Sequence, residues 1–194
     1  MVVKLLKSPP SSWKYFLLPT SIPKDGTPLK DSFSLRVEQP ISYWSQIYDF
    51  SDEIKVDIEV VRTYGRLITT IFVFGETKMP CSRCLELTKV QINANLKYIF
   101  SLKPSREDNE EDDLDRDMQE DLIILETWDE KIDLIPLIWE TLLSGLPAVE
   151  LCSKECKGLC PNCGENLNKA TCNCKKEEGD PRFDILRPFI EKEK

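Results

Sequence analysis

Hydrophobic and polar residues alternate over two stretches of the chain, residues 54–60 and residues 90–100. This period of two predicts β-strands with one buried face. A turn at residues 64–66 separates the first stretch from residues 67–74, which are rich in β-branched and aromatic side chains, so we expect a hairpin. The stretch at 90–100 is long for a strand, which favours a curved antiparallel β-sheet or partial barrel.

Shorter patterns flank this sheet. Three further strands are predicted at residues 13–18, 33–37 and 122–125. Residues 41–50 are predicted as a short helix whose core-facing side chains are Tyr43, Trp44 and Ile47.

A longer helix is predicted after Asp133, a residue type that caps helix N-termini. Pro136 is tolerated in its first turn, and residues 145–147, Gly-Leu-Pro, end it. Its apolar side should pack on the sheet and consists of Leu134, Leu137, Ile138, Leu142 and Leu143.

These elements predict an α+β protein of two parts. Residues 1–150 form a β-rich core domain with an acidic loop at 104–121. Residues 151–194 form a small cysteine-rich zinc-knuckle tail that packs on the core.

Six of the eight cysteines lie between residues 151 and 174. Zinc binds four thiolates in a tetrahedron and needs cysteine pairs brought together by tight turns. Cys160 and Cys163 have the spacing for such a turn, with Pro161 fixing φ and Gly164 allowing a positive φ. The other half of a single zinc site comes from one of two further pairs, Cys172 with Cys174 or Cys152 with Cys156. An iron site and a disulfide framework are the alternatives for these residues.

A separate pair, Cys81 and Cys84, follows the strand at 67–74 and precedes the strand at 90–100. It has three interpretations: ligands that complete a metal site with the later cysteines, a thiol–disulfide couple, or a structural turn with small buried thiols. A redox motif of the thioredoxin type opens a helix, whereas this pair is followed by a strand.

Composition removes several function classes. The chain has no histidine, which excludes Ser-His-Asp and Cys-His catalysis and HExxH zinc sites. Its seven glycines form no phosphate-binding motif, and we expect no small-molecule substrate. No apolar run approaches the roughly 20 residues that span a bilayer, and no signal peptide is evident. We therefore expect a cytoplasmic protein without membrane contact.

The net charge of −8 is unevenly spread. Residues 107–121 hold ten acids and one base, whereas residues 62–106 hold eight bases and two acids. Basic residues attract nucleic-acid phosphates, and exposed aromatic residues such as Tyr64, Tyr98 or Phe100 stack on bases. The predicted RNA- or partner-binding residues are Arg62, Arg66, Lys78, Arg83, Lys89 and Lys97. Arg83 stands apart, because an arginine in a tight loop between two cysteines is held ready for a phosphate or carboxylate.

Taken in order, three motifs resemble the YceD family of large ribosomal RNA subunit accumulation proteins: CSRCL at 81–85, CKGLCPNCGENLN at 156–168 and DPRF at 180–183. The resemblance implies a non-enzymatic ribosome-biogenesis factor, found in bacteria and plant plastids, that is needed for synthesis, processing or stability of 23S rRNA. The residues that match the family's two cysteine motifs are Cys81, Arg83, Cys84 and Leu85, and Cys156, Gly158, Leu159, Cys160, Cys163, Gly164, Asn166 and Leu167.

The expected partner is large-subunit rRNA or a ribosomal protein bound to it. Two alternatives come from other classes: a dithiol oxidoreductase that uses Cys81 and Cys84, and a zinc-knuckle protein-interaction module without direct RNA contact. We expect about one zinc ion per chain, with loss of order confined to residues 150–190 on chelation.

Overall fold

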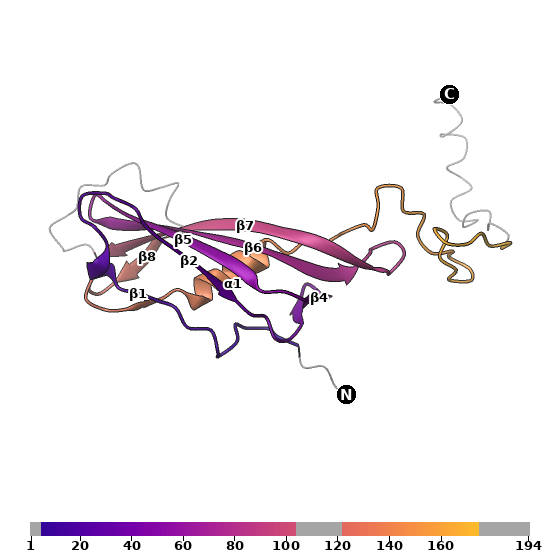
Figure 1. The fold of residues 1–194 in the computed structure, drawn as a ribbon, viewed down its shortest axis with the longest axis horizontal. Helices are drawn as coiled ribbons and strands as arrows, with labels where there is room; N and C mark the ends of the chain where they lie inside the picture. The colour runs from indigo at the N-terminus through magenta and orange to yellow at the C-terminus, as the bar shows by residue number, and fades with distance from the viewer. Residues whose placement is uncertain (1–4, 104–121, 175–194) are drawn as a thin grey trace, which may run out of the picture.

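The computed structural model describes residues 5–103 and 122–174 (Figure 1). The predicted acidic loop and the segment that contains DPRF lie outside these ranges. The described residues are mostly β-strand with a single α-helix. In chain order the elements are β1 Phe16–Leu17, the 3₁₀ turn η1 Pro19–Ser21, β2 Leu29–Leu35, β3 Ile41–Tyr43, β4 Gln46–Phe50, β5 Ile54–Thr63, β6 Arg66–Pro80, β7 Leu87–Leu102, β8 Leu122–Leu125, β9 Ile132–Asp133 and α1 Ile135–Ser144.

The longest strands, β6 and β7, form the middle of the sheet. They pair antiparallel from Leu67 opposite Phe100 to Pro80 opposite Leu87. The other edge of β6 pairs with β5 and, near its end, with β4, while β2 pairs with β5. The predicted hairpin between β5 and β6 is confirmed. The sheet is open, and the pairing of β8 with β7 is parallel rather than antiparallel.

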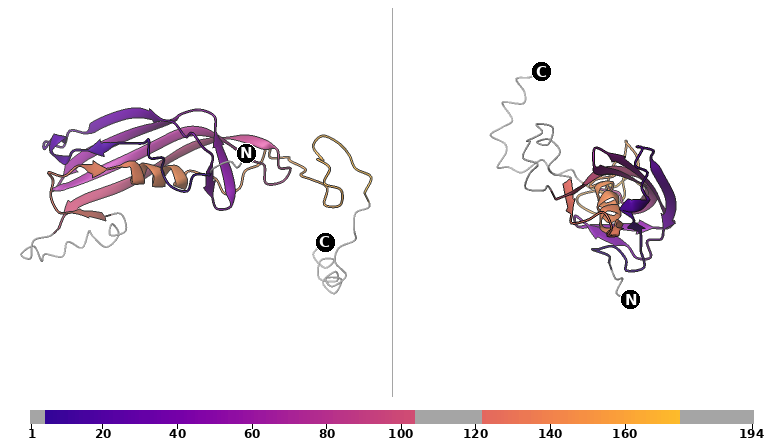
Figure 2. Two further views of the ribbon diagram at one scale, coloured as in Figure 1. Left: turned by 90° about the horizontal axis from the view of Figure 1, so that it is seen from below. Right: turned by 90° about the vertical axis from the view of Figure 1, so that its left-hand side faces the viewer.

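One face of the sheet carries the core. Its β6 side chains, including Leu67, Ile71 and Val73, are fully buried. The predicted helix α1 lies across this face (Figure 2, left). Leu134, not the predicted Asp133, is the N-cap residue of α1. The Asp133 carboxylate, one residue earlier, accepts a hydrogen bond from the Ile135 N–H at 3.0 Å. None of the described helices is long and apolar enough to cross a bilayer.

The helix predicted at residues 41–50 is wrong. This segment is the hairpin β3–β4, which turns at Trp44 and Ser45 with φ of 47° and 61°. A strand register buries Ile41 and Tyr48 completely, whereas it leaves Trp44 73% exposed. Tertiary burial of alternate residues therefore overrides the helical interpretation.

Candidate metal centres

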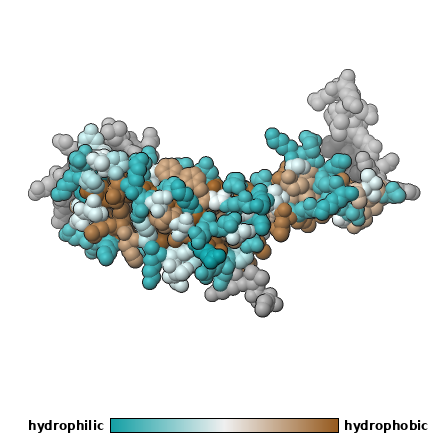
Figure 3. All heavy atoms as spheres, in the orientation of Figure 1, coloured by the Kyte–Doolittle hydropathy of each residue, from teal (hydrophilic) through white to brown (hydrophobic). Residues whose placement is uncertain are grey.

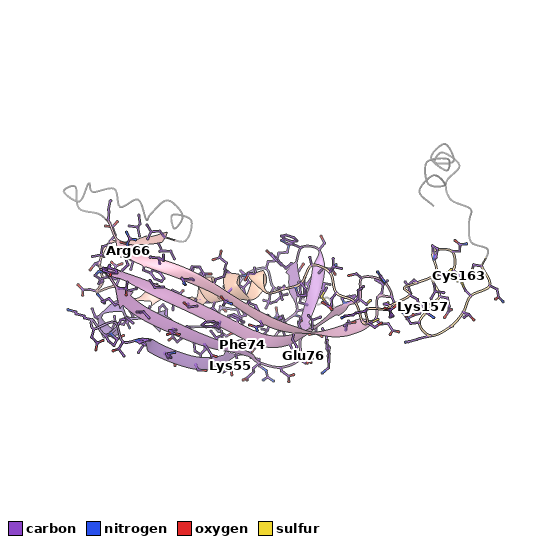
Figure 4. The ribbon with its side chains drawn as sticks, turned by 90° about the horizontal axis from the view of Figure 1, so that it is seen from above. Lys55, Arg66, Phe74, Glu76, Lys157 and Cys163 are labelled. Atoms are coloured by element: carbon purple, nitrogen blue, oxygen red, sulfur yellow. The ribbon has the colours of Figure 1, made fainter. Side chains whose placement is uncertain are left out.

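All eight cysteines are free thiols and gather in two clusters of four. The first cluster contains Cys81, Cys84, Cys152 and Cys156, and the second contains Cys160, Cys163, Cys172 and Cys174. Within each cluster the four sulfur atoms lie within 4.8 Å of one another. Figure 4 labels Cys163 in the tail, beyond the end of the long strands.

The sulfur separations suit a tetrahedral metal ion. The Cys81 and Cys156 Sγ atoms are 3.8 Å apart, and the Cys84 and Cys152 Sγ atoms are 3.5 Å apart. Four Zn–S bonds of about 2.3 Å place neighbouring sulfurs about 3.8 Å apart, whereas a disulfide requires about 2.05 Å. The first cluster is also largely buried, with Cys81, Cys84 and Cys156 each less than 5% exposed.

The two Cys-x-x-Cys turns share one backbone structure. In the first knuckle, residues 81–86, the Cys81 N–H donates to the Glu86 carbonyl at 2.8 Å and the Leu85 N–H to the Cys81 carbonyl at 2.9 Å. The second knuckle, residues 160–165, repeats both bonds: Cys160 N–H donates to the Glu165 carbonyl at 2.8 Å and Gly164 N–H to the Cys160 carbonyl at 2.9 Å. The fifth residue takes a positive φ in each, 61° at Leu85 and 75° at Gly164.

The first cluster joins two distant parts of the chain. Cys81 and Cys84 come from the loop between β6 and β7, while Cys152 and Cys156 begin the tail. The Leu159 N–H donates to the Arg83 carbonyl at 3.1 Å, and the Arg83 Nη1 donates to the Cys156 carbonyl at 2.9 Å. The tail is thus hydrogen-bonded to Arg83 of the loop through both the backbone carbonyl and the guanidinium of this residue.

Gly158 allows this close approach. Its φ is +76°, and a Cβ at this position would lie 3.1 Å from the Arg83 carbonyl oxygen. Any larger residue would suffer both the strained dihedral angle and the crowding. Glycine at this position therefore serves two purposes: it permits the positive φ of the tail backbone, and it lets the tail approach the loop at Arg83.

Glu86 makes a second link between the loop and the tail. Its carboxylate accepts a hydrogen bond from the Asn166 side-chain amide at 3.0 Å and forms an ion pair with Lys169. Apolar side chains stay exposed around the first knuckle, with Leu85 65% and Leu87 71% exposed. Figure 3 shows hydrophobic surface where the sheet passes into the tail.

Backbone and amide N–H groups point at the sulfurs. The Arg83 N–H donates to Cys81 Sγ at 3.5 Å, and the Asn168 amide donates to Cys156 Sγ at 3.3 Å. Burial opposes ionisation of Cys81, but the N–H donors outweigh it and lower the pKa of this thiol to about 6. Backbone N–H groups of Cys163 and Asn162 likewise lower the pKa of Cys160 to about 6.

In each cluster another thiol has a raised pKa. Neighbouring sulfurs, Cys156 first, raise the pKa of Cys152 to about 12, and Cys163 and Cys160 raise the pKa of Cys174 to about 12. Four adjacent thiolates repel one another, so only some of them can ionise without a cation. A divalent cation at the centre of each cluster would remove this conflict.

Sequence reasoning identified the four cysteine pairs but expected one zinc site, built on Cys160 and Cys163, and left the role of Cys81 and Cys84 open. The structure pairs Cys160 and Cys163 with Cys172 and Cys174, and it gives Cys152 and Cys156 to the loop cysteines. The signal for two sites was the total of eight cysteines, which equals two complete tetrahedral sets.

The predicted basic residues separate into three groups. Arg66, Lys78, Lys89 and Lys97 occupy outward positions on β6 and β7. Arg62 donates through Nη2 to the Pro19 carbonyl at 2.8 Å and lies over the Trp128 ring, 5.4 Å from its centroid. Arg83 lies in the first knuckle, bonded to the tail as described above.

Two of the three aromatic residues expected to stack on RNA are placed wrongly by the sequence argument. Tyr98 and Phe100 face the core and are 6% and 1% exposed, because alternate residues of β7 pack under α1. The Tyr98 hydroxyl donates to the Leu137 carbonyl at 3.1 Å. Tyr64, at the β5–β6 turn, is fully exposed.

Comparison with known families matches residues 70–189 to the family described as Large ribosomal RNA subunit accumulation protein YceD. The chain is similar to the Large ribosomal RNA subunit accumulation protein YCED homolog 1, chloroplastic, of Arabidopsis thaliana, with 28% identity over 72% of this chain and 50% of that protein. The Zea mays protein of the same name is 28% identical over 63% of this chain and 48% of its own length. The Uncharacterized protein YlbN of Bacillus subtilis is 28% identical over 62% of this chain and 64% of its own length.

The chain spans about half the length of the two plant relatives. No solved structure matches it.

Proposed function

Because this chain belongs to the YceD family of large ribosomal RNA subunit accumulation proteins, we propose that it promotes the accumulation of 23S rRNA as a non-enzymatic factor. The match over residues 70–189 carries this proposal, since it includes both knuckles and the whole of β7. The partner in this proposal is large-subunit rRNA or a ribosomal protein bound to it, met in the cytoplasm.

The cysteines support a structural role rather than catalysis. Cys81 and Cys84 do not form an isolated dithiol, because Cys152 and Cys156 lie within 4.8 Å of them. A metal ion held by all four sulfurs would occupy the thiolate that a disulfide oxidoreductase needs as its nucleophile.

Zinc is the ion that this donor set fits best. A closed set of four thiolates is typical of structural zinc sites, whereas a catalytic zinc site keeps one position open for water or substrate. In both clusters all four ligands come from the protein, so the proposed ions would stabilise the tail and its attachment to the β6–β7 loop. Iron in the same donor set is separated from zinc by elemental analysis and by its visible absorption.

The test measures the ratio of large-subunit to small-subunit rRNA in cells that lack the protein and in cells that express its variants. We expect loss of the protein to lower the ratio, and Cys160→Ser with Cys163→Ser to lower it as well. Lys154→Gln, an exposed tail residue outside both clusters, serves as the control and should restore the ratio. An unchanged ratio in cells that lack the protein would contradict the proposed function.

The alternative of a dithiol oxidoreductase is tested on the same preparation. The zinc-loaded protein should show no turnover with a disulfide substrate, and its thiols should react with alkylating reagents only after chelation. The oxidoreductase would be favoured instead if the metal-free protein turned over a disulfide substrate and this turnover required Cys81 and Cys84.

A further inference from the structure

We infer that the outer face of the β6–β7 pair, opposite α1, binds a short unpaired RNA segment by stacking bases on Phe72 and Phe74. This inference rests on the proposed function, because it names the RNA contact that such a factor would make. It also differs from the sequence-based expectation, which assigned stacking to Tyr98 and Phe100 of the core-facing side and to Tyr64 at the β5–β6 turn.

The two phenylalanines form an aromatic platform on the face of the sheet opposite α1, where both residues are half-buried. Both are at outward positions of β6: Phe72 lies between the buried residues Ile71 and Val73, and Phe74 follows Val73. Their rings are 6.5 Å apart between centroids, with 3° between the ring planes. Figure 2, left, looks onto the face covered by α1, and Figure 4 looks from the opposite side, where Phe74 is labelled on the sheet.

The neighbouring strand β7 has polar and no acidic outward side chains from Lys89 to Lys97, and the acid beside them on β6, Glu76, accepts a hydrogen bond from the Gln91 side-chain amide at 2.9 Å. The outward residues of β7 are all exposed and read Lys89, Gln91, Asn93, Asn95 and Lys97. Asn95 lies opposite Phe72 and Asn93 opposite Phe74 in the strand register. Amide side chains donate and accept hydrogen bonds, so each ring has a group beside it that can meet the edge of a stacked base.

Cations lie at both ends of this row. Lys97 pairs across the strands with Thr70, and Arg66 lies four residues beyond it along β6. At the other end Lys78 lies opposite Lys89, whose charge is offset by its ion pair with Glu76 at 2.7 Å. Lys89 and Lys97 are eight residues apart, or about 27 Å along a strand, which is long enough for several nucleotides.

The charge pattern favours β6–β7 over the adjoining strands. On β5, Asp57 and Glu59 flank a groove of about 540 Å³ beside Phe72. These acids form ion pairs with Lys55 at 2.9 Å and Lys30 at 3.4 Å, so the lysines there are already neutralised. A phosphate backbone would meet repulsion on that side and attraction along β7.

Fluorescence anisotropy of a labelled oligouridylate with the full, zinc-loaded chain tests the inference. Phe72→Leu with Phe74→Leu keeps apolar bulk on the strand but removes the rings, and it should weaken binding about tenfold or more. Lys97→Gln should reduce the slope of log affinity against log salt by about 0.7, as for one phosphate contact to a single strand. Lys30→Gln, on the neutralised side, is the matched control and should bind as wild type.

Circular dichroism and thermal melting of each variant establish that it is folded. Binding by the double leucine variant equal to wild type, or no binding by wild type at low salt, would overturn the inference. So would loss of self-association in sedimentation in place of lost RNA binding, because a second copy would then be the occupant. None of these outcomes bears on the cellular rRNA ratio, so the proposed function stands or falls separately.

Discussion

Residues with a positive φ in and beside the two knuckles should differ in how well they tolerate substitution. Leu85 and Gly164 occupy the same position after the second cysteine, and both have a positive φ. Leu85 shows that a side chain can be held in this conformation when the surrounding hydrogen bonds enforce it. Gly158 is different, because a Cβ there would lie 3.1 Å from the Arg83 carbonyl oxygen, so the backbone of Arg83 would have to shift by a few tenths of an ångström.

Gly158→Ala should therefore be more harmful than Gly164→Ala. Both variants force alanine into a positive φ, which costs about 1–2 kcal/mol, but Gly164 has no atom within 4 Å of the added Cβ. Urea unfolding of the zinc-loaded proteins measures the two costs. Equal losses of stability would mean that the contact between Gly158 and Arg83 has no energetic weight.

Arg83→Glu, which would remove the phosphate contact that the sequence predicts for Arg83, should also loosen the tail. It removes the hydrogen bond from the guanidinium to the Cys156 carbonyl and places a carboxylate beside four sulfurs. We expect faster hydrogen exchange in residues 151–168, measured by mass spectrometry. Lys154→Gln provides the control, and unchanged exchange in the Glu variant would show that Arg83 does not hold the tail.

At the level of elements, the packing of α1 on β7 organises the core. The Tyr98 hydroxyl lies 3.1 Å from both the Leu137 carbonyl and the Glu140 carboxylate, two acceptors for its one hydrogen, so it connects the strand to the helix. Gly145 ends the helix against β7, where a Cβ would come within 2.7 Å of the Ala94 Cβ. The helix and the strand thus approach through one small residue and one hydroxyl.

Tyr98→Phe should lower the free energy of unfolding by about 1 kcal/mol, because the hydroxyl that contacts Leu137 and Glu140 is lost while the ring remains. The Leu137 carbonyl keeps its hydrogen bond from the Thr141 hydroxyl at 2.8 Å. Tyr64→Phe is the matched control. That hydroxyl is fully exposed at the β5–β6 turn, so its loss should change stability by less than about 0.5 kcal/mol. Chemical denaturation compares them, and a Tyr98→Phe protein as stable as the control would contradict the assigned role.

At the scale of the whole molecule, the two cysteine clusters order different parts of the tail. The first cluster attaches the tail to the β6–β7 loop, whereas the second lies within the tail alone. This arrangement predicts two metal ions per chain and a wider effect of chelation than the sequence suggests, since residues 81–86 belong to the core hairpin.

Cys81→Ser with Cys84→Ser should reduce bound zinc from about two ions to about one, and should raise hydrogen exchange in both the β6–β7 loop and the start of the tail. Cys172→Ser with Cys174→Ser should also remove one ion but leave exchange in the loop unchanged. Elemental analysis and exchange mass spectrometry provide the two readings. A full complement of zinc in the first variant would show that the loop cysteines bind no metal.

The sequence by itself determined most of the local structure of this protein, with the segment 41–50, predicted as a helix and found as the hairpin β3–β4, as the exception. Alternation predicts β5, β6 and β7, since each strand has one buried face, and Asp133 with Pro136 predicts the start of α1. Cysteine spacing predicts both knuckles, because a two-residue separation is what a tight metal-binding turn needs. All of these follow from residues close together in the chain.

Only the tertiary structure decided which distant residues meet. Cys81 and Cys156 are 75 residues apart, and no local pattern says which pair of the tail completes the loop's cluster. Burial against α1 turned Tyr98 and Phe100 inward, and it left Phe72 and Phe74 on the open face. The physical reason is the same in both cases: long-range packing selects among alternatives that local spacing and periodicity do not distinguish.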